Sequence, residues 1–332
     1  MNALVIGGGG FLGSRIAQML HERGDRVTVF GRRRYPHLEA VGIACLQGDV
    51  RDADAVGRAC AERDAVFHVA AKVGVWGKRR AYQEVNVTGT QNVIEGCRAH
   101  GVHKLIYTST PSVVGGGEDL CGVDESQPYA SRYLTAYAQT KAEAERLVLA
   151  ANGPSLATVA LRPHLIWGPG DRELIPRLLD RARRGRLLQV GGGSNLVDIT
   201  YIDNASDAHV QAGDALAPGG RCAGRAYFIS QGEPVLLWPW IRDLLDRLGV
   251  PPIRRSVSFR TAYLVGAGLE TLFRALGRSS EPPMTRFVAI QLAKSHYFCI
   301  HAARRDFGYD PRVSTQEGVQ RLVEWYEQPA SP

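Results

Sequence analysis

A tyrosine and a lysine four residues apart, Tyr137 and Lys141, form the pair in this sequence best suited to chemistry. In a helix, side chains at this spacing share a face, so the phenol and the ammonium would lie side by side. The ordinary phenol pKa of about 10 is too high for easy proton transfer at neutral pH, and a nearby positive charge lowers it. The pair therefore predicts proton delivery to an oxygen atom, as the reduction of a ketone to an alcohol requires.

A hydroxyl-rich segment, Thr108-Ser109-Thr110, comes at the end of a predicted strand that covers residues 103–108. Ligands bind at the carboxyl ends of parallel strands, so these hydroxyls would face the substrate. We expect Thr110, rather than Ser109, to orient the substrate oxygen. Hydroxyls in such a segment also cap turns, and this alternative stays open.

Four other side chains near these motifs have less specific interpretations. Asn86 either anchors a water molecule behind the lysine or bonds the helix backbone. His164, Trp76 and Trp167 are expected to have structural roles. The histidines lack metal-ligand spacing and the six cysteines contain no C-x-x-C pair, so we expect neither a metal site nor a disulfide framework.

Four consecutive glycines begin where a predicted strand over residues 2–6 ends. Glycine belongs at such a turn because the backbone must bend tightly and approach a pyrophosphate, whose charge then lies at a helix N-terminus. The pattern therefore predicts a dinucleotide-binding turn. Its expected cofactor contacts are Gly7, Gly10, Phe11, Leu12 and Gly13.

The end of the second predicted strand, residues 26–30, indicates which dinucleotide would bind. An NAD site usually has an acidic residue there. This chain has Arg32 and Arg33 instead, and a guanidinium can bind the 2′-phosphate that a carboxylate would repel. We therefore expect NADPH/NADP+, held first by Arg32 and second by Arg33; the alternative is a solvated basic turn.

Later strands are expected to add cofactor contacts in sequence order. Asp49 would face the adenine amino group, and small residues after the fourth strand would let the cofactor approach. The predicted contacts are Asp49, Val50, Ala70, Ala71, Lys72, Thr108, Lys141 and Pro163.

These motifs require alternating strands and helices to position them. Apolar spacing predicts strands at 2–6, 26–30, 43–47, 65–69, 103–108, 156–161, 196–201 and 226–229, and helices at 11–23, 52–62, 82–100 and 133–150. This series predicts an α/β fold, a Rossmann-type doubly wound parallel sheet with a smaller, mostly C-terminal α/β substrate-binding lobe. The predicted NADP-binding domain covers 1–165 with 196–214 and 226–230, and the lobe covers 166–195 and 231–330.

Composition narrows the class of partner. The chain has 332 residues and a net charge of +7. The excess of basic residues lies mostly in short arginine clusters without interleaved aromatic residues. This pattern favours anionic small ligands over nucleic acid. The first predicted strand begins almost at Met1, which leaves no room for a signal peptide, so the expected compartment is the cytoplasm.

One segment of the predicted lobe, residues 259–276, has the composition of an amphipathic helix. Three interpretations stay open for its apolar side chains. The helix packs on its neighbours, lines a channel for a greasy substrate, or makes peripheral contact with a membrane surface.

The ordered set of motifs resembles the extended short-chain dehydrogenase/reductase superfamily over nearly the whole chain. The motifs are Gly7-x-x-Gly10-x-x-Gly13, Gly48-Asp49, Asn86-Val87-x-Gly89-Thr90, Tyr107-Thr108-Ser109-Thr110, Tyr137-x-x-x-Lys141, Leu161-Arg162-Pro163 and Tyr201-Ile202-Asp203-Asn204. The resemblance implies that Thr110 joins Tyr137 and Lys141 in a catalytic triad. The chain departs from the family pattern at Ile6, where threonine is common, and at Thr110, where serine is common.

Two further segments, Leu165 to Asp171 and Ala303 to Tyr309, resemble the 3β-hydroxysteroid dehydrogenase branch. Within it, Thr108 to Val113 and Glu281 to Phe287 resemble the bacterial group that reduces 2-alkyl-3-oxoalkanoates in long-chain olefin biosynthesis. This resemblance implies NADPH-dependent reduction of a hydrophobic β-keto acid with two long alkyl chains. It also implies a complex with a β-lactone synthetase and a decarboxylase of the same pathway.

We also expect a homodimer. Other functions stay open at this point: a 3β-hydroxysteroid or sterol-carboxylate dehydrogenase, a nucleotide-sugar epimerase or dehydratase, and an NADPH-sensing binding protein. Alkyl chain length and product stereochemistry lie beyond what the motifs specify.

Overall fold

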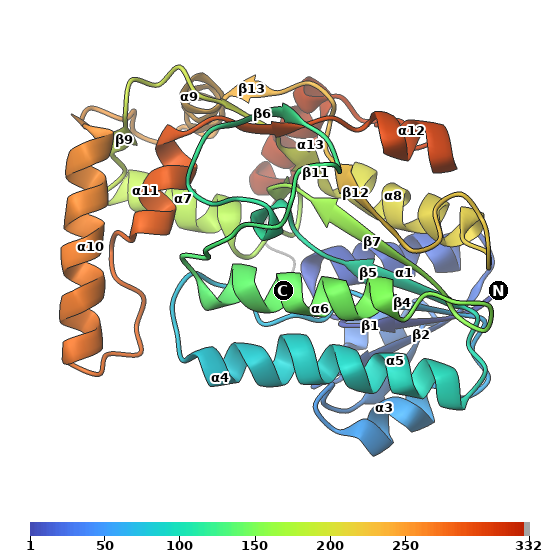
Figure 1. Ribbon diagram of the computed structural model, residues 1–332. Coiled ribbons are helices and arrows are strands. Elements are labelled where there is room, and N and C mark those ends of the chain that lie inside the picture. Colours follow the sequence, from blue (N-terminus) through green and yellow to red (C-terminus); the bar gives the residue numbers. More distant parts are fainter. Residues whose placement is uncertain (329–332) are drawn as a thin grey trace.

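A seven-stranded parallel sheet forms the centre of the computed structural model, which describes residues 1–328 (Figure 1). Its strand order is β12-β7-β5-β4-β1-β2-β3. These strands are β1 (Asn2–Ile6), β2 (Arg26–Gly31), β3 (Ala44–Gln47), β4 (Ala65–His68), β5 (Lys104–Thr108), β7 (Ala157–Pro163) and β12 (Arg225–Ile229). The predicted Rossmann-type parallel sheet is confirmed.

Helices cover both faces of this sheet (Figure 1). Successive side chains of a strand point to opposite faces, and β1 shows the consequence. Its Ala3 and Val5 belong to the core beneath one set of helices, and its Leu4 and Ile6 to the core beneath the other. The first set includes α1 (Phe11–Glu22) and α8 (Ile202–Ala215), and the second includes α3 (Ala53–Cys60), α5 (Gly89–Ala99) and α6 (Ala136–Ala150).

A smaller group of elements lies beyond the carboxyl end of the large sheet (Figure 1). It contains a four-stranded sheet of order β13-β10-β15-β6 and two strand pairs, β11-β8 and β14-β9. These strands are β6 (Leu120–Val123), β8 (Ile166–Trp167), β9 (Gln189–Val190), β10 (Leu196–Val197), β11 (Thr200–Tyr201), β13 (Val235–Leu236), β14 (Ser256–Val257) and β15 (His296–Phe298). The remaining helices are α2 (Pro36–Glu39), α4 (Arg79–Tyr82), α7 (Leu174–Arg183), α9 (Leu237–Arg247), α10 (Phe259–Ala275), α11 (Arg286–Ala293), α12 (His301–Phe307) and α13 (Thr315–Glu327).

Two predicted helices differ from the structure. The helix expected over 82–100 is interrupted by a π-helical turn over Gln83–Thr88, a feature that is frequent at functional sites. The helix expected over 133–150 begins at Ala136, because the Thr135 hydroxyl caps it by accepting the Ala138 N–H at 3.1 Å.

The strand expected over 196–201 is broken into β10 and β11, which belong to different sheets. The Asp198 N–H still donates to His296 in β15, but the Thr200 N–H donates to Leu165 beside β8. The chain therefore changes partners between these two residues.

The two-domain division with its boundaries stays a prediction, and residues 329 and 330 of the expected lobe lie outside the described part. Two contacts join the later segments of the predicted NADP-binding domain to its first segment. β12 pairs with β7 in the large sheet, and α8 packs on α1.

Within residues 1–328, no helix has both the length and the apolar content needed to cross a membrane.

Candidate active site

The start of α6 brings Tyr137 and Lys141 to the carboxyl end of β5. Lys141 is buried, and its Nζ atom donates to the Thr108 carbonyl oxygen at 2.5 Å. The same Nζ atom lies 4.1 Å from the centre of the Tyr107 ring. Tyr137 is half-buried one helical turn earlier. The predicted pair therefore lies beside the predicted hydroxyl segment.

Burial dominates the protonation of this pair. It raises the pKa of Tyr137 to about 12, although the neighbouring Thr110 hydroxyl opposes the shift. It lowers the pKa of Lys141 to about 7, although the charge of Glu145 opposes this shift. The expected lowering of the tyrosine pKa by the lysine is not found: burial has the largest effect on the pKa of the phenol, and the Lys141 Nζ atom donates to Thr108. At neutral pH the phenol keeps its proton, as a proton donor must.

The two candidate hydroxyls have different surroundings. Thr110 caps the short turn over Pro111–Val113 by accepting the Ser112 N–H at 3.3 Å, and it also lies next to Tyr137. The Ser109 hydroxyl lies next to the buried carboxylate of Glu145. Thr110 is therefore the hydroxyl that neighbours the phenol, and its capping role accompanies this position.

A buried ion pair lies behind the catalytic helix, and the motif search missed its acidic member. The Arg162 guanidinium donates to both carboxylate oxygens of Glu145, at 2.6 and 3.0 Å. The Tyr129 hydroxyl donates to the same carboxylate at 2.7 Å. Burial raises the pKa of Glu145, but the bonds to Arg162 outweigh it and the net pKa is lowered. The i+4 spacing of Glu145 from Lys141 was the signal that could have identified it.

The Asn86 side chain bonds the backbone of the segment after β4 and not the helix backbone, which was one of its two expected roles. Its side chain accepts the backbone N–H of Lys72 at 2.7 Å and donates to the Lys72 carbonyl at 3.1 Å. It also donates to the Thr140 hydroxyl on α6 at 3.0 Å. Asn86 therefore ties the chain after β4 to the catalytic helix.

The glycine turn has the backbone conformation and the close approaches that a dinucleotide-binding turn requires. Gly7 has a φ of +87°, and a Cβ atom there would lie 2.6 Å from the Ala70 backbone nitrogen. A Cβ atom at Gly13 would lie 2.4 Å from the Gly7 carbonyl oxygen. No side chain caps the N-terminus of α1, which begins at Phe11, so its first N–H groups and helix dipole are available to an anion. These residues fit a pyrophosphate group.

The basic turn after β2 contains two kinds of arginine. Arg34 is held by Glu39 at 3.0 Å. Arg32 and Arg33 are exposed, and the pKa of Asp49 is lowered mainly by the bonded Arg51, with a smaller contribution from the charge of Arg32. The Asp49 carboxylate itself accepts from the Arg51 guanidinium at 2.7 and 3.0 Å. The donor set of Arg32 and Arg33 fits a phosphate at this edge.

Tyr35 is a neighbour of the glycine turn that the motifs did not identify. Its ring packs so closely on Gly9 that a Cβ atom there would lie 1.9 Å away, and its hydroxyl lies 2.3 Å from the corresponding position at Gly31. These two glycines therefore make room for the tyrosine. No sequence spacing signals this contact.

The remaining predicted cofactor residues lie at the ends of the central strands. Val50 is buried against Gly89, and Ala70 and Ala71 follow β4. The Lys72 Nζ atom lies 5.2 Å from the centre of the Tyr82 ring, while its backbone is held by Asn86. Pro163 ends β7.

The histidine and tryptophans for which we expected structural roles make packing contacts. His164 is buried, and its ring bonds His296 at 2.6 Å. Trp167 is buried against Tyr201 and Trp240, and Trp76 packs on Phe273 of α10.

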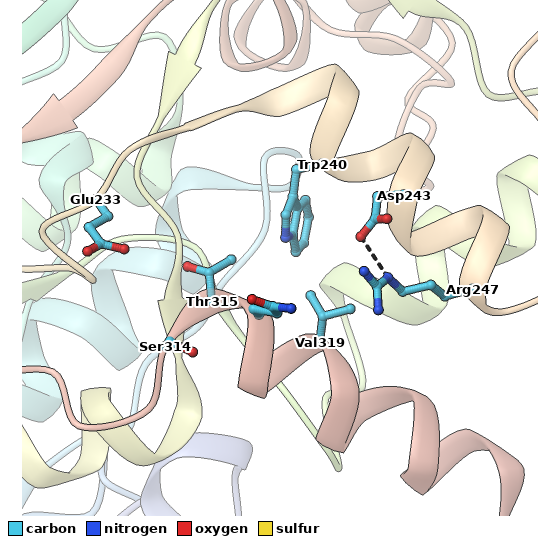
Figure 2. Close-up of a pocket in the computed structure, with 8 residues that line it drawn as sticks. Glu233, Trp240, Asp243, Arg247, Ser314, Thr315 and Val319 are labelled. Atoms are coloured by element: carbon cyan, nitrogen blue, oxygen red, sulfur yellow. Dashed lines mark hydrogen bonds and ion pairs between the residues drawn. The ribbon is translucent and has the colours of Figure 1, made fainter.

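One surface hollow of about 380 Å³ lies away from all the predicted site residues. Figure 2 shows it between α9, which carries Trp240, Asp243 and Arg247, and the N-terminus of α13. A second hollow of about 380 Å³ is bordered by Gly9, Gly10 and Phe11 of the glycine turn. Only the second hollow adjoins the predicted site.

A family model described as the 3-beta hydroxysteroid dehydrogenase/isomerase family matches residues 4–259. The chain belongs to this family. A 2-alkyl-3-oxoalkanoate reductase of Stenotrophomonas maltophilia is 53% identical, over 97% of this chain and 98% of that protein. A protein of the same name from Shewanella oneidensis is 51% identical, over 97% of this chain and 85% of that protein.

Solved structures share the fold of this chain. The structure titled "MoeE5 in complex with UDP-glucose and NAD" has a TM-score of 0.76 and 25% identity, and the match covers 98% of each chain. The predicted resemblance to the extended short-chain dehydrogenases and their 3β-hydroxysteroid branch is confirmed. The family's proteins named here are oxidoreductases.

Proposed function

We propose that this protein is an NADPH-dependent reductase that converts a long-chain 2-alkyl-3-oxoalkanoate into the 2-alkyl-3-hydroxyalkanoate. The observation that carries the proposal is 51–53% identity over 97% of the chain to two proteins named for that activity. The placement of Tyr137 beside Thr110 and of Lys141 beside Thr108 supports the reaction type. The uncapped glycine turn and the two exposed arginines support the cofactor.

In the proposed reaction the protein's side chains handle the proton. The Thr110 hydroxyl holds the substrate carbonyl oxygen next to Tyr137. Bound NADPH supplies the hydride to carbon 3. The Tyr137 phenol gives its proton to the oxygen, so the C=O bond becomes CH–OH, and solvent returns a proton to the phenolate. The Lys141 ammonium stabilises the phenolate as it forms.

A side-by-side assay tests the substrate class. NADPH absorbance is followed with a long-chain 2-alkyl-3-oxoalkanoate, a 3-ketosteroid and a UDP-sugar. We expect the β-keto acid to give the highest kcat/KM. Preferred turnover of the steroid would favour the alternative dehydrogenase, and a response to the UDP-sugar alone would reject the proposal. An NADPH sensor would turn over none of the three.

Replacing Arg32 tests the cofactor preference. A charge-assisted hydrogen bond contributes about 1.5–3 kcal/mol, so the Arg32→Ala variant should bind NADPH roughly 10- to 100-fold more weakly and NADH almost unchanged. Dissociation constants from fluorescence titration measure both. Arg34→Ala is the matched control, since Arg34 is already bound to Glu39. Equal losses for the two cofactors would contradict the role of Arg32.

The pH profile tests the role of Lys141. Its lowered pKa of about 7 means that the ammonium is present below that pH and is lost as pH rises through it. We expect kcat/KM for reduction to be level below pH 7 and to fall up to about tenfold per unit above it. In Lys141→Arg the charge persists at all these pH values, so this inflection should disappear. An inflection retained in the arginine variant would assign it to another group.

The finer partner assignments belong to the same proposal. We also propose a homodimer, and a complex with the β-lactone synthetase and decarboxylase that consume the hydroxy acid; the resemblance to the enzymes of the olefin pathway supports the complex. Analytical ultracentrifugation of the protein alone and with the two enzymes measures both. A monomer in the sample of the protein alone would reject the homodimer. Separate sedimentation of the protein and the two enzymes would reject the complex.

A further inference from the structure

The helix α10 packs on the protein through two small residues and one buried carboxylate. Ala262, Gly266 and Glu270 are its buried residues. A Cβ atom at Gly266 would lie 2.7 Å from the Thr285 backbone, so only glycine fits there. The Glu270 carboxylate accepts the Arg286 N–H and guanidinium, both at 2.8 Å. Close packing and an ion pair therefore fix α10 on α11.

Four apolar side chains of α10 and of the residue after it are exposed to solvent, whereas Phe259 and Tyr263 pack against the core. Leu264 is 69% exposed, Leu272 is 50% exposed, and Leu276 is 57% exposed. They are separated by eight and by four residues, with Gly268 midway between the first two. Val265 is 49% exposed beside them. The other exposed residues from 261 to 276 are uncharged except for Arg274. These four side chains are called the leucine stripe below, and exposed apolar side chains gathered on one helix mark an interaction site.

The charges around this stripe have one sign. Residues 254–280 contain five arginines and one acidic residue, Glu270, which is buried and already paired. The five are Arg254, Arg255, Arg260, Arg274 and Arg278. A partner for this surface must therefore be apolar and negatively charged. A second copy of α10 would bring like charges together, which argues against self-association through this face.

The C-terminal end of α10 contacts Trp76, which lies in the segment after the predicted cofactor residue Lys72. Trp76 donates its indole N–H to the Arg278 carbonyl oxygen at 3.2 Å, and the Arg274 guanidinium lies 5.3 Å from the Trp76 ring. Four residues before Trp76, the backbone of Lys72 is held by Asn86. A ligand bound along α10 would thus lie next to the segment between Lys72 and α4, which Asn86 ties to the catalytic helix α6.

We propose that α10 docks this protein on an anionic phospholipid surface. The leucine stripe enters the boundary between headgroups and acyl chains, and the arginines bind lipid phosphates. The inference rests on the proposed function for its purpose, since a β-keto acid with two long alkyl chains partitions into membranes. Docking brings Trp76 and the segment next to the candidate site to the membrane that holds this substrate.

Vesicle flotation tests the docking without measuring turnover. We expect the full protein to float with vesicles of phosphatidylcholine and phosphatidylglycerol, and to float at least about tenfold less with phosphatidylcholine alone or in high salt. The variant Leu264→Ser/Leu272→Ser/Leu276→Ser should lose flotation. Val41→Ser/Leu236→Ser, which removes exposed apolar residues elsewhere, should keep it.

The outcomes separate this inference from the proposed function. Turnover of a short-chain, water-soluble β-keto acid should be equal in the wild type and the triple variant, and its absence in both would reject the reductase alone. Absent flotation of the wild type, or equal flotation of the triple variant, overturns docking. A change of sedimenting mass in the triple variant without vesicles assigns the stripe to a protein contact and also overturns it. If the triple variant does not fold, Leu264→Ser and Leu276→Ser are measured singly.

Discussion

The Tyr137→Phe variant is expected to lose about 10³-fold in kcat for ketone reduction while its dissociation constant for NADPH stays the same. Phenylalanine keeps the ring but removes the only proton that the proposed reaction delivers to the substrate oxygen. General acid catalysis contributes roughly 10²–10⁴-fold, which sets the size of the loss. Steady-state NADPH oxidation and a fluorescence titration of NADPH give the two numbers.

Tyr133→Phe is the matched control for this variant. Tyr133 is also a partly buried tyrosine near the start of α6, but its hydroxyl donates to the Val113 carbonyl oxygen at 3.1 Å. This variant loses one structural hydrogen bond and should retain its turnover. Similar kcat values for Tyr137→Phe and Tyr133→Phe would remove Tyr137 from the mechanism.

Glu145→Gln is expected to lower the free energy of unfolding by about 3–5 kcal/mol. The glutamate is fully buried, and the substitution leaves the Arg162 guanidinium charged, 4% exposed and without its counter-ion. Breaking one side of a buried pair costs far more than the pair contributes as a unit. Urea unfolding followed by circular dichroism measures the loss.

Glu143→Gln serves as the comparison on the same helix. Its carboxylate is partly exposed and lies 3.5 Å from Arg79, so its loss should be much smaller. The double variant Glu145→Leu/Arg162→Met should recover much of the stability, because it buries no unpaired charge. A Glu145→Gln protein as stable as Glu143→Gln would show that the buried charge of Arg162 is compensated elsewhere.

The large sheet and the ends of its strands could be predicted because their signals are local. The glycine turn needs particular backbone angles and close approaches, which Gly7 and Gly13 demonstrate. The spacing of Tyr137 and Lys141 needs only one helix, and α6 supplies it. Each of these features is determined by a few neighbouring residues.

Features that depend on contacts between distant segments could not be predicted in the same way. The lysine pKa of about 7 results from its burial against β5, and the ion pair of Glu145 joins α6 to β7. The composition of residues 259–276 indicated an amphipathic helix, but only packing against α11 determines that the leucines face outward. Periodicity identifies two faces of a helix and does not say which one is buried.

Isotope transfer tests the central claim most directly. The protein is incubated with NADPH that carries deuterium at both C4 positions and with a long-chain 2-alkyl-3-oxoalkanoate, and the product is analysed by mass spectrometry. We predict a 2-alkyl-3-hydroxyalkanoate with one deuterium at carbon 3, formed by the wild type and almost absent with Tyr137→Phe. A product without deuterium at carbon 3, or equal labelled product from the phenylalanine variant, would contradict the account.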